Sequence, residues 1–166
     1  IGYHYAALQT NPDSAWLSLD PSGDSVLTSL NIPMGDEIAL NVFLKNDSAA
    51  AVQVIYPLCY DPSVFQLDTA YFDTTAFPNW TIWQISSNIR DTIYSDSGKI
   101  LFNASEPGGA AYALPQGTHR IGILKFTAID TGEFIIDTCL YPPLIHNIYY
   151  MDTLYVNHYP SWSNVN

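Results

Sequence analysis

The sequence has few charged side chains, and very few of these are positive. Only 13% of its 166 residues are charged, and 5 Lys and Arg stand against 16 Asp and Glu, which gives a formal net charge of −11. An average soluble domain carries roughly 25% charged residues. Nucleic-acid binding relies on clustered cations that displace counterions from phosphates. Two arginines and three lysines cannot build such a patch, so a nucleic-acid-binding protein is excluded.

Long hydrophobic runs are also absent. A membrane-spanning helix needs about 18 or more consecutive apolar residues, and no segment of the sequence approaches this length. The chain begins at Ile1 rather than Met and shows no signal-peptide pattern. One hypothesis is therefore a processed product that has already lost a leader, and the upstream gene sequence would test it.

Glutamate is scarce as well, and this absence indicates the fold class. Of the 16 acidic residues, 13 are Asp and 3 are Glu. Asp favours turns and caps, whereas Glu and Lys are good helix formers. The 12 Tyr, 7 Phe, 4 Trp and 11 Pro favour strands and turns instead. The composition predicts an all-β protein.

The order of apolar residues gives the strands. Residues 37–45 and 51–60 alternate between apolar and other positions with a period of two, which is typical of strands with one buried face. Further strands are predicted at 80–85, 99–104, 121–128, 134–138 and 148–156. Turn clusters separate them, and no long helical pattern lies between them. We therefore expect one β-sandwich or jelly-roll domain over residues 1–166.

Several short motifs occur in an order that resembles cohesin-like domains. They are the Gly35-Asp36 turn before a strand, the Tyr60-Asp61-Pro62 end of the next strand, and the later segments 98–102 and 122–128. The resemblance covers about residues 30–140. It implies a jelly-roll sandwich of about nine strands that is extracellular, is non-catalytic and binds a dockerin module through one sheet face. The segments 1–29 and 141–166 would be strand-like extensions, acting as extra strands or as intermolecular arms.

Cys59 and Cys139 are the only cysteines. In an exported protein they would be expected to bond, and in the cytosol they would be two buried thiols. A bond would close a loop of about 80 residues, worth roughly 4–5 kcal/mol on the chain-entropy model. Cys59 lies in the opposite phase from Leu58 and Tyr60, which argues against a bridge inside the sandwich, so both alternatives stay open.

Three Asn-Xaa-Ser/Thr sequons begin at Asn46, Asn79 and Asn103. Their use depends on export and on a cell that glycosylates. Asn46 is predicted to lie in an exposed turn and is the best candidate, whereas plain structural roles are expected for the other two.

The sequence offers little for metal or catalytic chemistry. The four histidines lack the spacing of zinc sites. Asp20 and Asp24 flank a short loop whose oxygens suit Ca²⁺, although Asp-Pro-Ser-Gly is also ordinary turn chemistry. No nucleophile elbow or phosphate loop occurs, and we expect a non-enzymatic protein without a cofactor.

Three functional hypotheses follow. The first is an extracellular or cell-surface assembly module that binds a dockerin-like partner or further copies of itself, as a homo-oligomer, filament or lattice formed by exchange of terminal strands. The second is a carbohydrate-binding module. Trp80 and Trp83 are three apart, so on a regular strand one would face the core and the other could contact sugar or a partner. The third, a glycosidase, has no motif in its favour.

Overall fold

The computed structural model describes residues 2–6, 12–77, 79–80, 82–88, 98–106, 108–139 and 147–163. Within these ranges the chain forms thirteen strands and one short 3-10 helix, η1 (Gly109–Tyr112). This confirms the all-β prediction. None of the described helical structure has the length and hydrophobicity that crossing a membrane would require.

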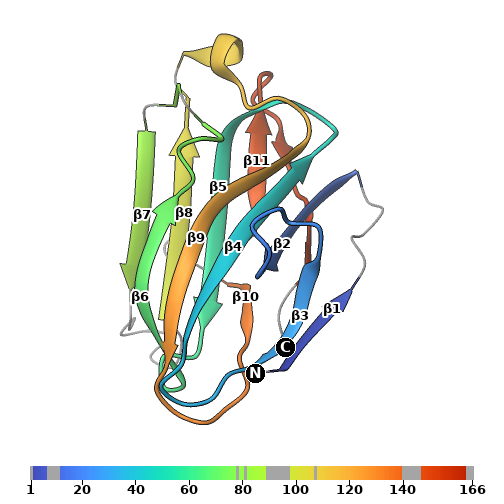
Figure 1. Cartoon of the computed structure of the whole chain (residues 1–166). Coiled ribbons are helices and arrows are strands. Elements are labelled where there is room, and N and C mark those ends of the chain that lie inside the picture. Colours follow the sequence, from blue (N-terminus) through green and yellow to red (C-terminus); the bar gives the residue numbers. More distant parts are fainter. Residues whose placement is uncertain are drawn as a thin grey trace.

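Two sheets face each other (Figure 1). Sheet I has the order β13 (Ser161–Ser163), β2 (Asp13–Ser18), β4 (Glu37–Asn46), β9 (Thr118–Ala128) and β6 (Phe65–Phe72). Sheet II has the order β12 (Asn157–His158), β11 (Tyr149–Asp152), β5 (Ala51–Tyr60), β8 (Gly98–Ser105) and β7 (Ile82–Asn88), and β10 (Ile136–Thr138) also pairs with β5. A separate ribbon joins β1 (Gly2–Ala6) to β3 (Val26–Asn31). Strand β2 of the predicted N-terminal extension and strands β11, β12 and β13 of the C-terminal one thus belong to the two sheets.

The core lies between the two sheets and follows the predicted alternation. In β4 the inward residues Leu40 and Val42 are fully buried, and in β5 Val54 and Tyr56 are fully buried. Since side chains alternate across a strand, the residues between them point to the outer faces of the sandwich. Those outer faces are where a folded sandwich can meet a partner.

Pro57 lies in the central strand β5, although proline cannot donate a ladder hydrogen bond. On one side of β5, pairing with β10 ends at Leu58 and pairing with β11 begins at Ile55. The Pro57 carbonyl accepts a hydrogen bond from Cys139 N (3.4 Å) on this side. In an extended strand the backbone N and O of one residue point to the same side of the strand. The position where Pro57 lacks an N–H donor therefore faces the gap between β10 and β11.

The prediction of one strand over residues 148–156 is wrong. Strand β11 ends at Asp152, and a turn intervenes before β12 begins at Asn157. The Asp152 side chain accepts hydrogen bonds from the amides of Leu154 (2.8 Å) and Val156 (3.0 Å), which bends the chain there. The predicted strand 80–85 begins instead at Ile82, and Trp80 precedes it.

Candidate interaction surfaces

Part of the outer face of sheet I is closed by the chain itself. Trp16 and Phe43 point outward from β2 and β4, yet both are buried, and their rings stack with centroids 5.4 Å apart. Val26 joins this cluster. Gly23, with φ +75°, lies so close that a Cβ there would come within 2.6–2.9 Å of the Phe43 ring. A partner therefore cannot reach this half of the face.

A polar network lies next to this cluster. Arg120 donates from Nε to Asp73 Oδ2 (2.7 Å) and from its terminal nitrogen to Asn41 Oδ1 (3.2 Å). Asn41 is buried and donates to the Ser18 carbonyl (3.2 Å). Burial alone would raise the pKa of Asp73, but hydrogen bonds from Thr75 and Arg120 bring it below its usual value. The network connects β2, β4 and β9 and is structural in character.

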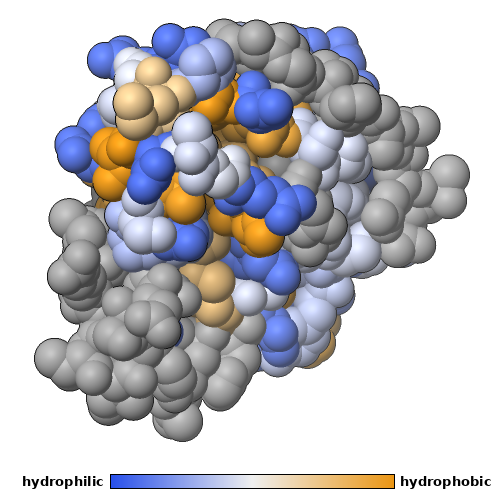
Figure 2. Space-filling model, turned by 90° about the horizontal axis from the view of Figure 1, so that it is seen from below, coloured by the Kyte–Doolittle hydropathy of each residue, from blue (hydrophilic) through white to orange (hydrophobic). Residues whose placement is uncertain are grey.

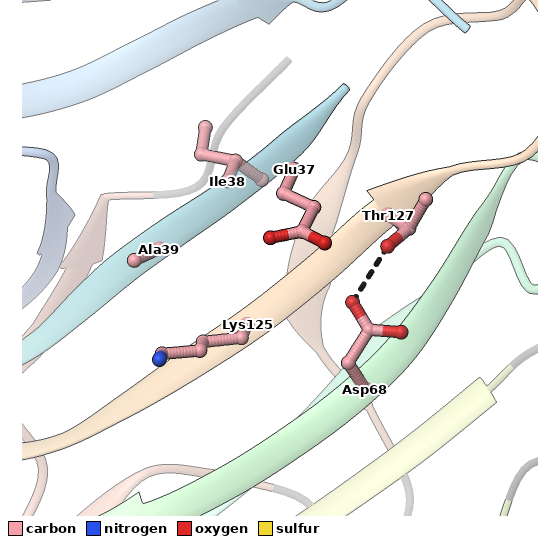
Figure 3. A pocket seen from close by; sticks show the side chains of 6 residues that line it. All are labelled: Glu37, Ile38, Ala39, Asp68, Lys125 and Thr127. Atoms are coloured by element: carbon pink, nitrogen blue, oxygen red, sulfur yellow. Dashed lines mark hydrogen bonds between the residues drawn. The ribbon is translucent and has the colours of Figure 1, made fainter. Parts of the chain in front are cut away.

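The remaining part of this face is open and polar. It holds a shallow pocket of about 340 Å³ between β4, β9 and β6, lined by Glu37, Ile38, Ala39, Asp68, Lys125 and Thr127 (Figure 3). Asp68 accepts a hydrogen bond from Thr127 Oγ1 (2.7 Å), and Lys125 extends away from Asp68. The lining offers neither a histidine nor a thiol, and the pocket is a charged groove.

The outer face of sheet II has a different character. Ile55 and Leu101 are diagonal neighbours on β5 and β8 and form an apolar cluster, against which Tyr149 of β11 packs, but they are only 3% and 6% exposed. Next to them, Gln53 Nε2 donates to Asn103 Oδ1 (3.1 Å). The chain itself therefore covers these apolar side chains, and this part of the face meets solvent through the half-buried amides of Gln53 and Asn103.

The structure places both cysteines on this same outer face. Cys59 of β5 lies opposite Asp137 of β10 and opposite Lys99 of β8. Cys139 follows β10 two residues after Asp137, and so points to the same side as Asp137. The sequence argument against a bridge inside the sandwich does not apply, because both thiols lie outside the core. They are unbonded in this structure.

The residues of the family motif shape two turns at the ends of strands. Gly35 has φ +90° in the turn before β4, and its N donates to the Ala128 carbonyl (2.7 Å). Tyr60 is buried at the end of β5, with its ring edge-on to Phe126. Asp61 then accepts hydrogen bonds from Ser63 N (2.8 Å) and Oγ (2.6 Å). Asp36 and Pro62 complete the same two turns.

The prediction that Asn46 lies in an exposed turn is wrong. Asn46 is the last residue of β4 and is fully buried, and its amide donates to the carbonyls of Ala49 (2.9 Å) and Pro115 (3.1 Å). An oligosaccharide cannot be attached there in the folded chain. Asn103 is half-buried in β8, whereas Asn79 is exposed and is the most accessible of the three sequons.

The Asp20–Asp24 loop brings its two carboxylates to opposite sides of one hydroxyl. Ser22 Oγ lies 2.7 Å from Asp20 Oδ2 and 2.8 Å from Asp24 Oδ2. Hydrogen bonds from the Ser22 amide and hydroxyl lower the pKa of Asp20. Across the described part of the chain, no three His, Cys, Asp or Glu side chains gather as metal ligands. Calcium binding here stays a prediction, and a thermal melt that does not move between excess Ca²⁺ and chelator would end it.

Trp80 is a core residue. It is 5% exposed, packs on Phe77 with ring centroids 4.7 Å apart and donates from Nε1 to the Tyr112 carbonyl (2.9 Å). A tryptophan held in this way cannot stack on a sugar. The side chain of Trp83 lies outside the described residues, so the carbohydrate hypothesis gains no support from either position.

The β11–β12 turn, where the sequence predicted a continuous strand, presents apolar side chains to solvent. Leu154 and Tyr155 are 78% and 75% exposed, Val156 is also exposed, and Tyr155 has φ +62°. Besides the two amides, Asp152 contacts His158 Nε2 at 2.9 Å. The hydrogen bond from His158, followed by those from the amides, lowers the pKa of Asp152. The Asp-Xaa-Leu-Tyr-Val pattern was the available signal, because Asp favours turns.

The opposite end of the sandwich carries a second group of exposed apolar residues. Met34, Ile129 and Ile135 lie in loops at this end and are each more than 40% exposed. In the view from below, apolar residues are interspersed with hydrophilic ones (Figure 2). Asp36 and Asp130 lie in these same loops, and Asp61 lies in the turn after β5, whose Val64 carbonyl accepts a hydrogen bond from Ile129 N. This end is therefore a mixed surface rather than a continuous apolar patch.

Comparison with known proteins finds similarity in structure and not in sequence. No protein-family model and no curated protein sequence matches the chain.

Solved structures do match it over most of its length. The sixth cohesin of scaffoldin B from Acetivibrio cellulolyticus, solved with a dockerin, superposes with a TM-score of 0.67 at 9% identity, covering 93% of this chain and 96% of that one. The cohesin CaCohA2 from Clostridium acetobutylicum gives 0.61 at 16% identity, covering 92% and 88%. A type I cohesin–dockerin complex from Clostridium thermocellum gives 0.62 at 11% identity, covering 98% and 96%. The chain therefore has a cohesin-like jelly-roll fold.

Proposed function

We propose that the chain is a non-catalytic, exported assembly module that binds a dockerin-like protein on the outer face of sheet II. The observation that carries this proposal is the cohesin-like fold over more than 90% of the chain. Several of the similar structures are complexes of a cohesin with a dockerin. The low sequence identity leaves the choice of partner to this chain's own surface residues.

The two outer faces differ in what they offer such a partner. On sheet I, the Trp16–Phe43 half is covered, and the open half is charged through Glu37, Asp68 and Lys125. On sheet II, Ile55 and Leu101 in the middle of the face are buried, and the half-buried amides of Gln53 and Asn103 beside them are uncharged. Protein interfaces deplete charge at their centre. The lower charge in the middle of sheet II favours this face.

A pair of charge-matched variants tests the proposal. Gln84→Arg adds a positive charge on β7, whose outward residues include Gln84, and Ala39→Arg adds the same charge on the open part of sheet I; both positions are exposed. Binding is measured by calorimetry against purified type I and type II dockerins. We expect Gln84→Arg to weaken binding at least tenfold and Ala39→Arg to leave it unchanged.

Two results would contradict the proposal. Loss of binding in Ala39→Arg alone would move the interface to sheet I. Absence of binding to every dockerin by the wild-type chain would remove the dockerin-like partner altogether.

Self-assembly by exchange of terminal strands is a second candidate, favoured by the position of β1. Among the described residues this strand pairs with β3 alone, in a ribbon separate from both sheets, from Gly2↔Asn31 to Ala6↔Val26. A neighbouring chain could supply the identical strand at little cost in hydrogen bonds. Deletion of residues 1–6 removes β1 and leaves β2 whole, since β2 begins at Asp13. If sedimentation of the protein is the same before and after this deletion, exchange of β1 is wrong.

A further inference from the structure

Cys59 and Cys139 occupy a site that combines two thiols with two charges. On the outer face of sheet II, Lys99, Cys59 and Asp137 stand in a row across β8, β5 and β10, because each is directly opposite the next in the strand register. Cys139 is the diagonal neighbour of Cys59, since its N bonds to the Pro57 carbonyl two residues before Cys59. Two thiols, an ammonium group and a carboxylate therefore meet at one place.

The contacts of the two sulfurs differ. Cys59 Sγ donates to the Asp137 carbonyl at 3.6 Å. The Cys139 thiol is also within hydrogen-bonding reach of the Cys59 sulfur. This S–H donor, aided by Lys99, lowers the pKa of Cys59 against burial and Asp137, and the same contact raises the pKa of Cys139. Cys59 is thus the thiol that ionises first, and the thiolate is the nucleophilic form of cysteine.

We propose that Cys59 and Cys139 are a redox pair, in which Cys59 attacks a low-molecular-weight disulfide and Cys139 closes an internal bond that ties β10 to β5. In the first step Cys59 forms a mixed disulfide with one half of the small disulfide, and the other half leaves as a thiolate that takes up the proton lost by Cys59. In the second step Cys139, after losing its proton, attacks the Cys59 sulfur. The second half then leaves and takes up that proton, so two protein thiols are oxidised and one small disulfide is reduced to two thiols.

The local backbone permits this closure. Diagonal neighbours across antiparallel strands are roughly 7–8 Å apart at Cα, slightly more than most disulfides span. The end of β10 must therefore move toward β5. Strand β10 has only three residues and Cys139 lies just beyond it, so the movement disturbs little of the ladder.

Mass spectrometry of the full chain tests both the bond and the order of attack. The reduced protein is incubated with oxidised glutathione, and the reaction is quenched with iodoacetamide. The mass of the intact chain is then measured. We expect the wild-type chain to lose both alkylatable thiols without retaining glutathione. Cys139→Ser should retain one glutathione on Cys59, and Cys59→Ser should react about tenfold more slowly at Cys139. Two thiols that persist in the wild type, a disulfide-linked dimer, or equal rates in the two variants would overturn the proposal.

Urea unfolding supplies a readout that is independent of reaction rates. The oxidised wild-type chain should unfold at a higher urea concentration than the reduced chain, because the bond closes a long loop in the unfolded state. The double variant Cys59→Ser and Cys139→Ser should show one midpoint under both conditions. An oxidised wild-type chain whose midpoint equals that of the reduced chain would contradict a bond between β10 and β5.

Discussion

Arg120 is one of only two arginines, and its guanidinium is committed to structure. It bridges Asp73 and Asn41 on the outer face of sheet I, where both ends of the Arg120–Asp73 pair are partly shielded from water. Fully exposed ion pairs contribute about 0–1 kcal/mol, whereas hydrogen bonds to charged groups contribute about 1.5–3 kcal/mol. The contribution of Arg120 to stability should be closer to that of a hydrogen bond to a charged group, because Asp73 and Asn41 would both lose a donor without Arg120.

Replacing Arg120 should therefore destabilise the fold. We expect Arg120→Ala to lower the free energy of unfolding by about 1–3 kcal/mol, measured by urea denaturation. Lys125→Ala removes an exposed cation from the same strand and should change stability by less than about 0.5 kcal/mol. Equal losses in the two variants would show that net charge, and not the network, is responsible.

The same pair predicts acid sensitivity. Because the folded-state pKa of Asp73 is lowered, its contribution is fully present above the unfolded value of about 3.9 and is lost as the pH falls through the folded value. Asp73→Asn should therefore reduce stability at neutral pH and flatten its decline below pH 4. Unfolding curves that decline as steeply in the variant as in the wild type would assign the acid sensitivity to other carboxylates.

At the scale of elements, two motif glycines meet different requirements, close packing at Gly122 and a positive φ at Gly35. Gly122 of β9 has no room for a side chain, since a Cβ would lie 2.6 Å from the Tyr71 carbonyl oxygen and 2.7 Å from the Phe102 ring. Gly35 has open space but a positive φ. We expect Gly122→Ala to cost about 1–3 kcal/mol through overpacking and Gly35→Ala about 1–2 kcal/mol through backbone strain. Thermal denaturation of both variants would measure the two losses of stability. A crystal structure of Gly122→Ala would show whether the backbone moves, and so would separate overpacking from backbone strain.

The β11–β12 turn depends on one carboxylate. Asp152→Ala removes the acceptor of the Leu154 and Val156 amides. Amide hydrogen exchange at these two positions should then accelerate roughly threefold to tenfold, as expected for a hydrogen bond of 0.5–1.5 kcal/mol. Asp24→Ala, in an exposed loop elsewhere, is the control and should leave both amides unchanged. Protected amides in Asp152→Ala would mean that the strand pairing alone holds the turn.

The sequence predicted strands in which apolar residues alternate over many positions, and it did not predict β2, β3 or β6. The bounds of β5 are as predicted, and those of β4 differ by one residue, because their inward residues alternate cleanly. Strand β2 was not predicted, since Ala15 and Leu17 face the core while Trp16 is buried on the other side. Leu154 and Val156 continued an apolar pattern that the Asp152 side chain interrupts.

The functional surfaces were harder to predict than the strands. The outward phase of Cys59 was read correctly, but the position of Cys139 beside it depends on the pairing of β10 with β5. These residues are about 80 positions apart, and no local pattern encodes their register. The same holds for the Ile55–Leu101 cluster, which forms only when β5 and β8 pair.

For the whole molecule, the excess of negative charge should make stability depend on salt. The chain carries 16 acidic against 5 basic residues, and in the described part of the structure Lys45 pairs with Asp47 and Arg120 with Asp73. Like charges repel more strongly in the compact state than in the extended one, and salt shortens their range from about 30 Å at 0.01 M to about 3 Å at 1 M. We expect the melting temperature to rise as sodium chloride increases from 0.01 to 0.5 M. A falling melting temperature would mean that the ion pairs outweigh the repulsion.

The pairing of β13 with β2 determines how the domain carries a mechanical load. These two strands come from opposite ends of the sequence and run parallel, from Ser161↔Ser14 to Ser163↔Trp16. If the module is pulled through its two ends, β2 and β13 are drawn in opposite directions along their common axis. The hydrogen bonds between them are then sheared together instead of being opened one at a time. We expect a barrier to extension at this pair, and a proline placed in β13 should lower the rupture force seen in single-molecule pulling.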